Sequence, residues 1–181
     1  LAPCSFIDYE KIGTAGNDER KYVSFLGRFH REKNPLIFVR AIGAIASEFP
    51  EVKFLMMGHG PFETKIRNAV ESMGIADRVE IRAELNPIQY LKKSLIFVSI
   101  QTRDNYSSQA LMEAMACKCA IIASDVGLTA QIVPDGIGVR IPLCPDTLAD
   151  NLRNLLNEPK KADRLGIAAS EFVRETQTID R

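Results

Sequence analysis

Residues 95–118 read LIFVSIQTRDNYSSQALMEAMACK, and this stretch decides the fold. It opens with the apolar run Leu95–Ile100, which is typical of a strand buried on both faces, as in parallel sheets. A polar loop, Gln101–Tyr106, comes next, and then a helix whose N-cap is predicted at Ser107 or Ser108. Free backbone N–H groups and the positive end of the helix dipole point into such a loop. The pattern therefore favours a site for a phosphate-bearing ligand.

Glu113 stands out within that predicted helix. The positions three and four residues away hold only neutral side chains: Gln109, Ala110, Ala116 and Cys117. No Lys or Arg on the same helix face can therefore pair with Glu113. Its other neighbours are small or apolar, and burying an unpaired carboxylate is costly or shifts its pKa. We expect either a partner from elsewhere or a solvated carboxylate at the rim of the helix.

Strands and helices alternate along the rest of the chain. Apolar runs predict further strands at 22–27, 51–58, 79–83, 119–124 and 138–142. Helical spacing and Pro or Gly boundaries predict helices from 34–35 onward and at 61–73, 87–93, 147–157 and 160–175. This order indicates an α/β fold with a doubly wound, Rossmann-like parallel sheet. Ligands of such sheets bind in the loops at the carboxyl ends of the strands.

Length and composition describe one soluble globular domain. The chain has 181 residues, with 23 Lys and Arg against 23 Asp and Glu, so no bulk charge argues for nucleic acid. No apolar run approaches the roughly 20 residues that a membrane span requires. Residues 1–20 carry Pro, Gly and charge without periodicity and are interpreted as a linker or interdomain arm before a domain at 21–181. The chain begins at Leu1 rather than Met, so we expect a piece of a longer protein, with a processed mature protein as the alternative.

The cysteines and histidines predict no metal site. The four cysteines lack the paired C-x-x-C spacing of zinc sites, and Cys117 and Cys119 lie in apolar sequence. Buried free thiols in a reducing compartment are the favoured interpretation. The two histidines, His30 and His59, are too few and too far apart for a metal cluster.

The loop at residues 27–33, GRFHREK, holds two candidate phosphate ligands, Arg28 and Lys33. Two cations at the mouth of one strand, beside a helix N-terminus, suit a diphosphate, although solvated loop cations would give the same pattern. The glycines at 58 and 60 form only a G-x-G, because the sixth position is Glu63. A classical NAD or FAD site is therefore excluded. A P-loop is excluded as well, because its consensus sequence, G-x-x-x-x-G-K followed by Ser or Thr, does not occur in the chain.

Four motifs in this order resemble a known family: GRFHREKNP, MMGHGP, LMEAMAC and IIASDVGLTAQIVPDGIGV. Together they look like the C-terminal, donor-binding half of a retaining glycosyltransferase with the GT-B fold, in the GT4-like group 1 family. The resemblance covers residues 20–175. It implies a nucleotide-diphosphate sugar donor, UDP- or GDP-linked, with no cofactor and no metal. It also implies a separate N-terminal domain, absent from this chain, that recognises a glycan, lipid or similar acceptor.

The resemblance assigns roles to five residues of the phosphate and ribose sites. Arg28 and Lys33 match the cations that bind the donor diphosphate, and the loop at Ser107 and Ser108 would offer backbone N–H groups. Glu113 matches the second acid of the E-x7-E motif, which binds the ribose hydroxyls. A ligand would then supply the partner that its own helix lacks. The resemblance further implies a cytoplasmic enzyme, with peripheral attachment to the inner membrane face only through the missing domain.

The base and sugar contacts follow from two further segments. The segment along the base has Arg82, Ala83 and Leu85 as its contact residues, and the donor sugar would meet Asp104, Asn105 and Tyr106. Eight residues before Glu113 stands Asn105, and nine before it stands Asp104, so either is the candidate catalytic residue in place of the first acid. Lys118 stands where the family usually has Gly.

Two alternatives share these motifs. One is a nucleotide-sugar epimerase of the same fold, which would isomerise a sugar without an acceptor. The other is a non-catalytic nucleotide-sugar-binding domain that lacks the first acid of the motif.

Overall fold

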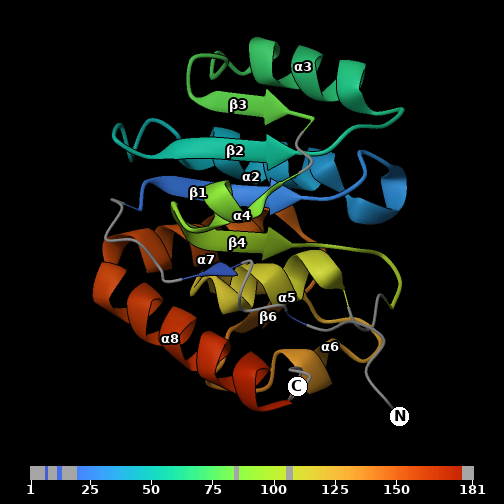
Figure 1. Cartoon of the computed structure of the whole chain (residues 1–181). Helices are drawn as coiled ribbons and strands as arrows, with labels where there is room; N and C mark the ends of the chain where they lie inside the picture. Colours follow the sequence, from blue (N-terminus) through green and yellow to red (C-terminus); the bar gives the residue numbers. More distant parts are fainter. Residues whose placement is uncertain (1–6, 8–11, 14–19, 84–85, 105–107, 177–181) are drawn as a thin grey trace.

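A computed structural model describes residues 7, 12–13, 20–83, 86–104 and 108–176. Within these ranges six parallel strands form one sheet in the order β3-β2-β1-β4-β5-β6 (Figure 1). The strands are β1 (Tyr22–Leu26), β2 (Lys53–Met57), β3 (Val79–Arg82), β4 (Ser94–Ser99), β5 (Ala120–Ser124) and β6 (Val139–Ile141). This topology confirms the predicted doubly wound sheet.

Helices cover both faces of the sheet (Figure 1). They are η1 (Arg31–Lys33), α2 (Pro35–Ile45), α3 (Glu63–Ser72), α4 (Ile88–Leu91), α5 (Gln109–Ala116), α6 (Thr129–Ile132), α7 (Pro145–Asn157) and α8 (Pro159–Thr176). One core layer packs α2, α3 and α7 against the sheet, and the other packs α4, α5 and α8. None of the described helices is both long enough and apolar enough to cross a membrane.

The central strands are apolar throughout because both of their faces are covered. In β5, Ile122 belongs to the core layer under α2 and α7, whereas its neighbour Ile121 belongs to the layer under α5 and α8. Both side chains are fully buried. Burying a side chain of this size contributes about 1.5–3 kcal/mol, so the two-sided burial of the central strands stabilises the fold.

Helix boundaries follow the sequence signals, with one difference. α2 begins at Pro35 as predicted, but the side chain of Asn34 makes no cap hydrogen bond. The reason is that Asn34 adopts the left-handed conformation (φ 47°, ψ 42°) that joins η1 to α2. Ser108 stands at the predicted N-cap of α5, also without a side-chain cap hydrogen bond. Gly74, with φ +66°, follows the end of α3 as expected.

The segment at residues 1–20, interpreted as an arm, touches the domain at its described positions. Ile7 and Ile12 are each 5% exposed and belong to the core layer beneath α5 and α8. The arm therefore packs on the domain at these two side chains.

The chain reverses its direction of travel across the sheet between β1 and β4. From β1 it proceeds through β2 to β3 on one side, and from β4 through β5 to β6 on the other. The loops that follow β1 and β4 consequently flank a topological switch point, where open α/β sheets bind ligands.

Candidate functional site

The loops after β1 and β4 are joined by backbone hydrogen bonds. The N–H of Thr102 donates to the carbonyl oxygen of Glu32 at 3.0 Å, and the hydroxyl of Thr102 donates to the same oxygen at 3.3 Å. Because these two residues lie 70 positions apart in sequence, the contact depends on β1 and β4 being neighbours in the sheet. It fixes η1 against the end of β4 and so defines one site from two loops.

Lys33 lies at the centre of this junction. Its Nζ donates to Oε1 of Gln101 at 2.9 Å, and its side chain is half-buried. Gln101 is buried, and its backbone N–H and carbonyl oxygen both bond to the hydroxyl of Ser124 at 3.0 Å. Burial lowers the pKa of Lys33, while the charge of Glu32 acts in the opposite direction. The ammonium group is thus held in place by a neutral oxygen, and no carboxylate of the described residues forms an ion pair with it.

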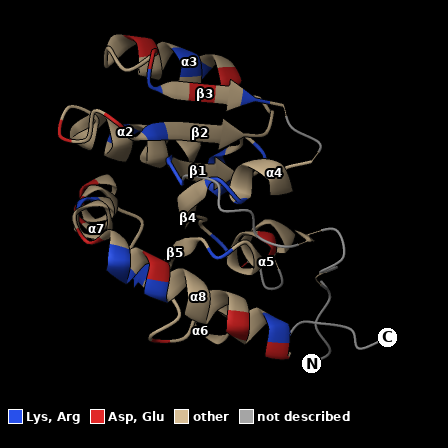
Figure 2. Cartoon of the chain, turned by 60° about the vertical axis from the view of Figure 1, so that its left-hand side comes forward, with Lys and Arg blue, Asp and Glu red and all other residues tan. Residues whose placement is uncertain are grey.

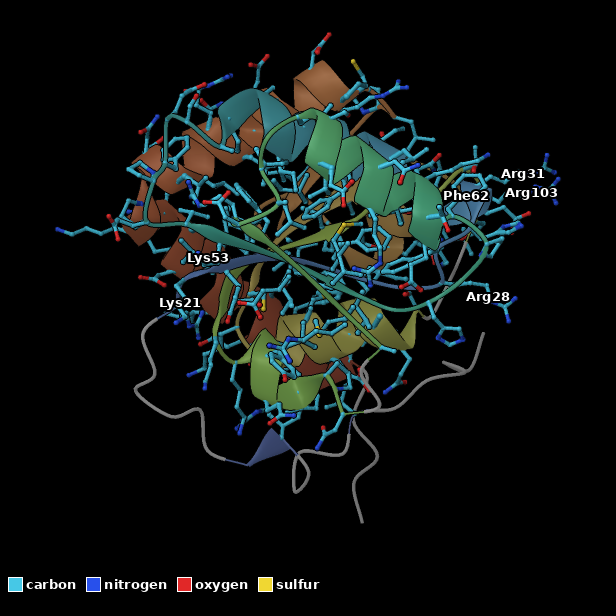
Figure 3. The ribbon with its side chains drawn as sticks, turned by 90° about the horizontal axis from the view of Figure 1, so that it is seen from above. Lys21, Arg28, Arg31, Lys53, Phe62 and Arg103 are labelled. Atoms are coloured by element: carbon cyan, nitrogen blue, oxygen red, sulfur yellow. The ribbon has the colours of Figure 1, made fainter. Side chains whose placement is uncertain are left out.

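Arg28 lies in the loop that follows β1, and this loop is hydrogen-bonded to the loop that follows β2. The N–H of Phe29, whose ring is fully buried, donates to the carbonyl of His59 at 2.9 Å. A methyl group added at Gly58 would stand 2.0 Å from the carbonyl oxygen of Gly27. The G-x-G at positions 58–60 therefore serves the close approach of two loops. Arg28 itself is exposed at the carboxyl end of the sheet (Figure 3).

Asp104 lies at the same end of the sheet, against the loop that follows β5. It is exposed, and a methyl group added at Gly127 would stand 2.4 Å from its Cβ and Cγ. Its side chain therefore packs on the backbone of the loop that follows β5. The predicted sugar and phosphate contacts Asn105, Tyr106 and Ser107 lie outside the described residues.

Glu113 occupies the middle of α5 and is half-buried. Nε2 of Gln109 donates to its Oε1 at 3.0 Å, which is a neutral partner one turn earlier. The helix is otherwise uncharged, so its acidic segment stands alone among neutral residues (Figure 2). As the sequence predicts, no Lys or Arg of its own helix pairs with this carboxylate.

Arg82 is committed to protein partners. Its Nε and Nη2 donate to Oε2 of Glu80 at 3.1 and 2.9 Å, and its guanidinium lies 5.1 Å from the ring centroid of Tyr90. Ala83 is exposed, and Leu85 lies outside the described residues. A nucleotide base lying along this segment would meet the backbone and the Arg82 guanidinium, which is already paired with Glu80 and stacked on Tyr90.

Sequence reasoning did not single out Gln101, Thr102 or Ser124 as parts of the site. Each lies at or just beyond the end of an apolar strand, so the only available signal was the first polar side chain after the run. Among the residues that the structure describes, no three His, Cys, Asp or Glu side chains come together in a way that would hold a metal ion.

A match to a model of a protein family identifies the family of this chain. The model described as glycosyl transferases group 1 matches residues 8–172, nearly the whole chain. The chain belongs to this family. The resemblance of its four motifs is thereby confirmed, and so is its place in the Rossmann-like half of a GT-B fold.

Curated relatives of this glycosyltransferase domain include two proteins that are named mannosyltransferases. It is 27% identical over 177 residues to the lipopolysaccharide core biosynthesis mannosyltransferase LpcC of Rhizobium leguminosarum, covering 94% of the chain and 50% of the relative. It is 26% identical over 168 residues to phosphatidyl-myo-inositol mannosyltransferase of Mycobacterium tuberculosis, covering 85% and 43%. The chain thus spans about half the length of the relatives it matches.

Solved structures share its fold. The C-terminal domain of a group 1 glycosyl transferase from Francisella tularensis superposes with a TM-score of 0.80 at 22% identity, covering 90% of this chain and 88% of that one. HepE of Anabaena, solved with UDP and glucose, superposes with a TM-score of 0.79 at 16% identity, covering 88% and 45%. At these identities the likeness describes the fold alone.

Proposed function

We propose that this chain is the donor-binding domain of a retaining glycosyltransferase that uses a nucleotide-diphosphate sugar. The whole protein would transfer the sugar to a glycan, lipid or similar acceptor recognised by its other half. The observation that carries the proposal is Lys33, a half-buried cation held by the neutral amide of Gln101 at the switch point of the sheet. A bound diphosphate would form the ion pair that no described carboxylate forms with Lys33.

The proposed role of the cations is to stabilise the departing diphosphate. Arg28 is exposed at the same strand end, so a diphosphate between Arg28 and Lys33 would meet two positive charges. Charge-assisted hydrogen bonds of this kind contribute about 1.5–3 kcal/mol each. Negative charge grows on the leaving group in the transition state, so preorganised cations lower the barrier. In this proposal the chain's own cations neutralise the diphosphate, without a metal or cofactor.

The proposed ribose ligand is Glu113. Among the described residues its carboxylate is hydrogen-bonded to the neutral amide of Gln109 alone, so it can still accept hydrogen bonds from hydroxyl groups. Asp104, packed on Gly127, would take the place of the first acid at the donor sugar, beside Asn105 and Tyr106. The backbone at Ser107 and Ser108, ahead of α5, would donate to the phosphates.

The comparisons support glycosyl transfer as the class of reaction, and they leave uracil and guanine both open as the base of the donor nucleotide. Two relatives are named mannosyltransferases, and HepE was solved with UDP and glucose. We therefore propose UDP- and GDP-linked sugars as the donors to test first. We also propose a cytoplasmic location, with any membrane contact made through the remaining half of the protein.

Calorimetric titration of UDP and GDP into the 181-residue chain tests the binding site. We expect weak binding of one nucleotide, and Lys33→Ala and Arg28→Ala should each weaken it by about tenfold or more. Lys160→Ala and Arg164→Ala, which remove exposed cations of α8, are the matched controls and should leave the affinity unchanged. Equal affinity in all four variants would contradict the proposed diphosphate site.

Turnover of the full-length protein tests the reaction. Incubation with UDP- and GDP-sugars and an acceptor extract should release a nucleoside diphosphate and form a new glycoside with the anomeric configuration of the donor. Isomerisation of the sugar without an acceptor would indicate an epimerase, and binding without turnover would indicate a non-catalytic domain. Asp104→Ala should abolish turnover while Asn105→Ala should not, if Asp104 replaces the first acid. The 181-residue chain alone should transfer nothing.

A further inference from the structure

Two arginines that are not part of the proposed diphosphate site follow two neighbouring strands, β1 and β4, at the carboxyl end of the sheet. Arg31 belongs to η1, and Arg103 follows β4. Figure 3 shows both side chains pointing outward on the same side of the molecule. Both side chains are exposed, and neither side chain makes a hydrogen bond or ion pair with a residue that the structure describes.

The backbone holds this arginine pair together. Arg31 directly precedes Glu32, and Arg103 directly follows Thr102, whose N–H and hydroxyl both donate to the carbonyl oxygen of Glu32. Two like charges kept close by the fold repel each other, and a shared anion removes that repulsion. The planar guanidinium fork suits phosphate oxygens in particular, because it can donate two parallel hydrogen bonds.

The nearby carboxylates leave the arginine pair with surplus positive charge. The side chain of Asp104 packs on Gly127, which places it toward the loop after β5. Glu32 acts electrostatically on Lys33. Neither carboxylate forms an ion pair with Arg31 or Arg103.

The side chains of the arginine pair point away from the contact that Lys33 makes with Gln101. Nζ of Lys33 points inward to the buried amide of Gln101, whereas Arg31 and Arg103 point outward into solvent (Figure 3). A nucleotide diphosphate sugar carries two negative charges, and Arg28 with Lys33 already matches them. The arginine pair therefore exceeds what the donor requires, at the edge of the sheet where substrates meet.

We propose that Arg31 and Arg103 bind a phosphate group carried by the acceptor, while the other half of the protein recognises the rest of the acceptor. This inference rests on the proposed function, because it names the chemistry of the second substrate of the same site. The phosphate could be a monoester, as on a phosphorylated sugar, or a diester, as in a lipid headgroup. Both present oxygens that fit the same pair of guanidinium groups.

Side-chain NMR of the arginine Nε–H groups in nitrogen-15-labelled chain tests the inference. The chain is first saturated with UDP or GDP, whichever binds, and is then titrated with glycerol 3-phosphate or with the diester glycerophosphoglycerol. The signals of Arg31 and Arg103 should shift and saturate with at least one probe, and the tighter probe identifies the ester class. The double variant R31A/R103A should weaken binding by about fivefold to tenfold. R40A/R164A, which removes two exposed arginines from α2 and α8, should not change it.

Two results would overturn the inference. One is the absence of any shift at Arg31 and Arg103 with either phosphate probe. The other is a shift of both signals caused by the nucleotide itself that blocks the probe, because the pair would then belong to the donor. If neither nucleotide binds, the proposed function fails separately, and a surviving phosphate titration would no longer point to an acceptor.

Discussion

The backbone of Gly127 lies directly against the side chain of Asp104. A methyl group at Gly127 would stand 2.4 Å from Cβ and Cγ of Asp104 and 2.8 Å from its Oδ1. Gly127 has φ +52°, so its place in the loop after β5 favours glycine on both conformational and steric grounds. This contact orients the candidate for the first acid of the site.

Gly127→Ala should therefore impair transfer more than it impairs folding. The methyl group must displace Asp104, and a misplacement of about 1 Å can cost about a hundredfold in rate. Gly136→Ala is the matched control, because Gly136 also has positive φ (+86°) but faces open space. Both variants should lose about 1 kcal/mol of unfolding free energy from the backbone conformation. Turnover by the full-length protein distinguishes the two variants. Equal turnover would mean that the position of the Asp104 side chain does not affect sugar transfer.

The affinity for nucleotide diphosphate should fall at high pH because of Lys33. Its pKa lies below the ordinary lysine value of 10.5, and burial is the main cause. The folded state disfavours the charged form, so charged Lys33 costs stability below its folded pKa, and this cost disappears as the pH rises toward the unfolded value. A diphosphate needs the charged form, so binding is strongest below the folded pKa and is lost as the pH rises through it.

Calorimetry over a range of pH checks this dependence. The decline in affinity should begin below pH 10.5 in the native chain and be absent in Lys33→Arg, which stays charged. Comparing the two proteins with the same nucleotide cancels the titration of the nucleotide itself. Parallel profiles for both proteins would show that Lys33 does not contact the phosphates.

Glu113→Ala should separate ribose recognition from phosphate recognition. Losing hydrogen bonds to a carboxylate should weaken UDP or GDP binding by about tenfold. The affinity for inorganic pyrophosphate, which has no ribose, should stay the same, whereas Lys33→Ala should weaken both ligands. Weaker pyrophosphate binding in Glu113→Ala would contradict the ribose assignment.

Lys118→Gly should stabilise the protein. α5 ends in a Schellman arrangement, in which the N–H of Lys118 bonds to the carbonyl of Met115 and the N–H of Cys119 to that of Ala114. Lys118 is the residue in the left-handed position (φ +61°), which glycine adopts without strain. We expect a gain of about 0.5–1 kcal/mol in unfolding free energy, measured by urea denaturation. Asn34→Gly, at φ 47°, should gain less because Asn tolerates this conformation; no gain at Lys118 would contradict the account.

The three described thiols should differ sharply in reactivity. Burial raises the pKa of Cys117 to about 12 and raises that of Cys119 as well. Cys144 is half-buried, and hydrogen bonds from Thr147 lower its pKa. At pH 8 iodoacetamide should label Cys144 more than about a hundredfold faster than the two buried thiols, as read by peptide mass spectrometry. Labelling at comparable rates in the native protein would show that the layer beneath α5 is open.

Local patterns in the sequence predicted most of the fold. The apolar run at Leu95–Ile100 became β4, buried on both faces, and Gly74 followed the end of α3 as expected. Such features are readable because burial and backbone conformation depend on residues close together in the chain. The sequence motifs alone likewise identified the glycosyltransferase family, since four ordered segments carry it. The assignments of Arg28, Lys33, Asp104 and Glu113 stay predictions.

Only the tertiary structure decided how those segments meet. The hydrogen bond from Lys33 to Gln101 joins residues 68 positions apart, and the pairing of Arg82 with Glu80 and Tyr90 and the outward arginine pair were equally unreadable. The bond from Lys33 to Gln101 follows from β1 lying beside β4, and the order of strands in a sheet depends on crossover connections rather than on local periodicity. The sequence by itself therefore determined the elements and the family, and the sheet determined which loops form the site.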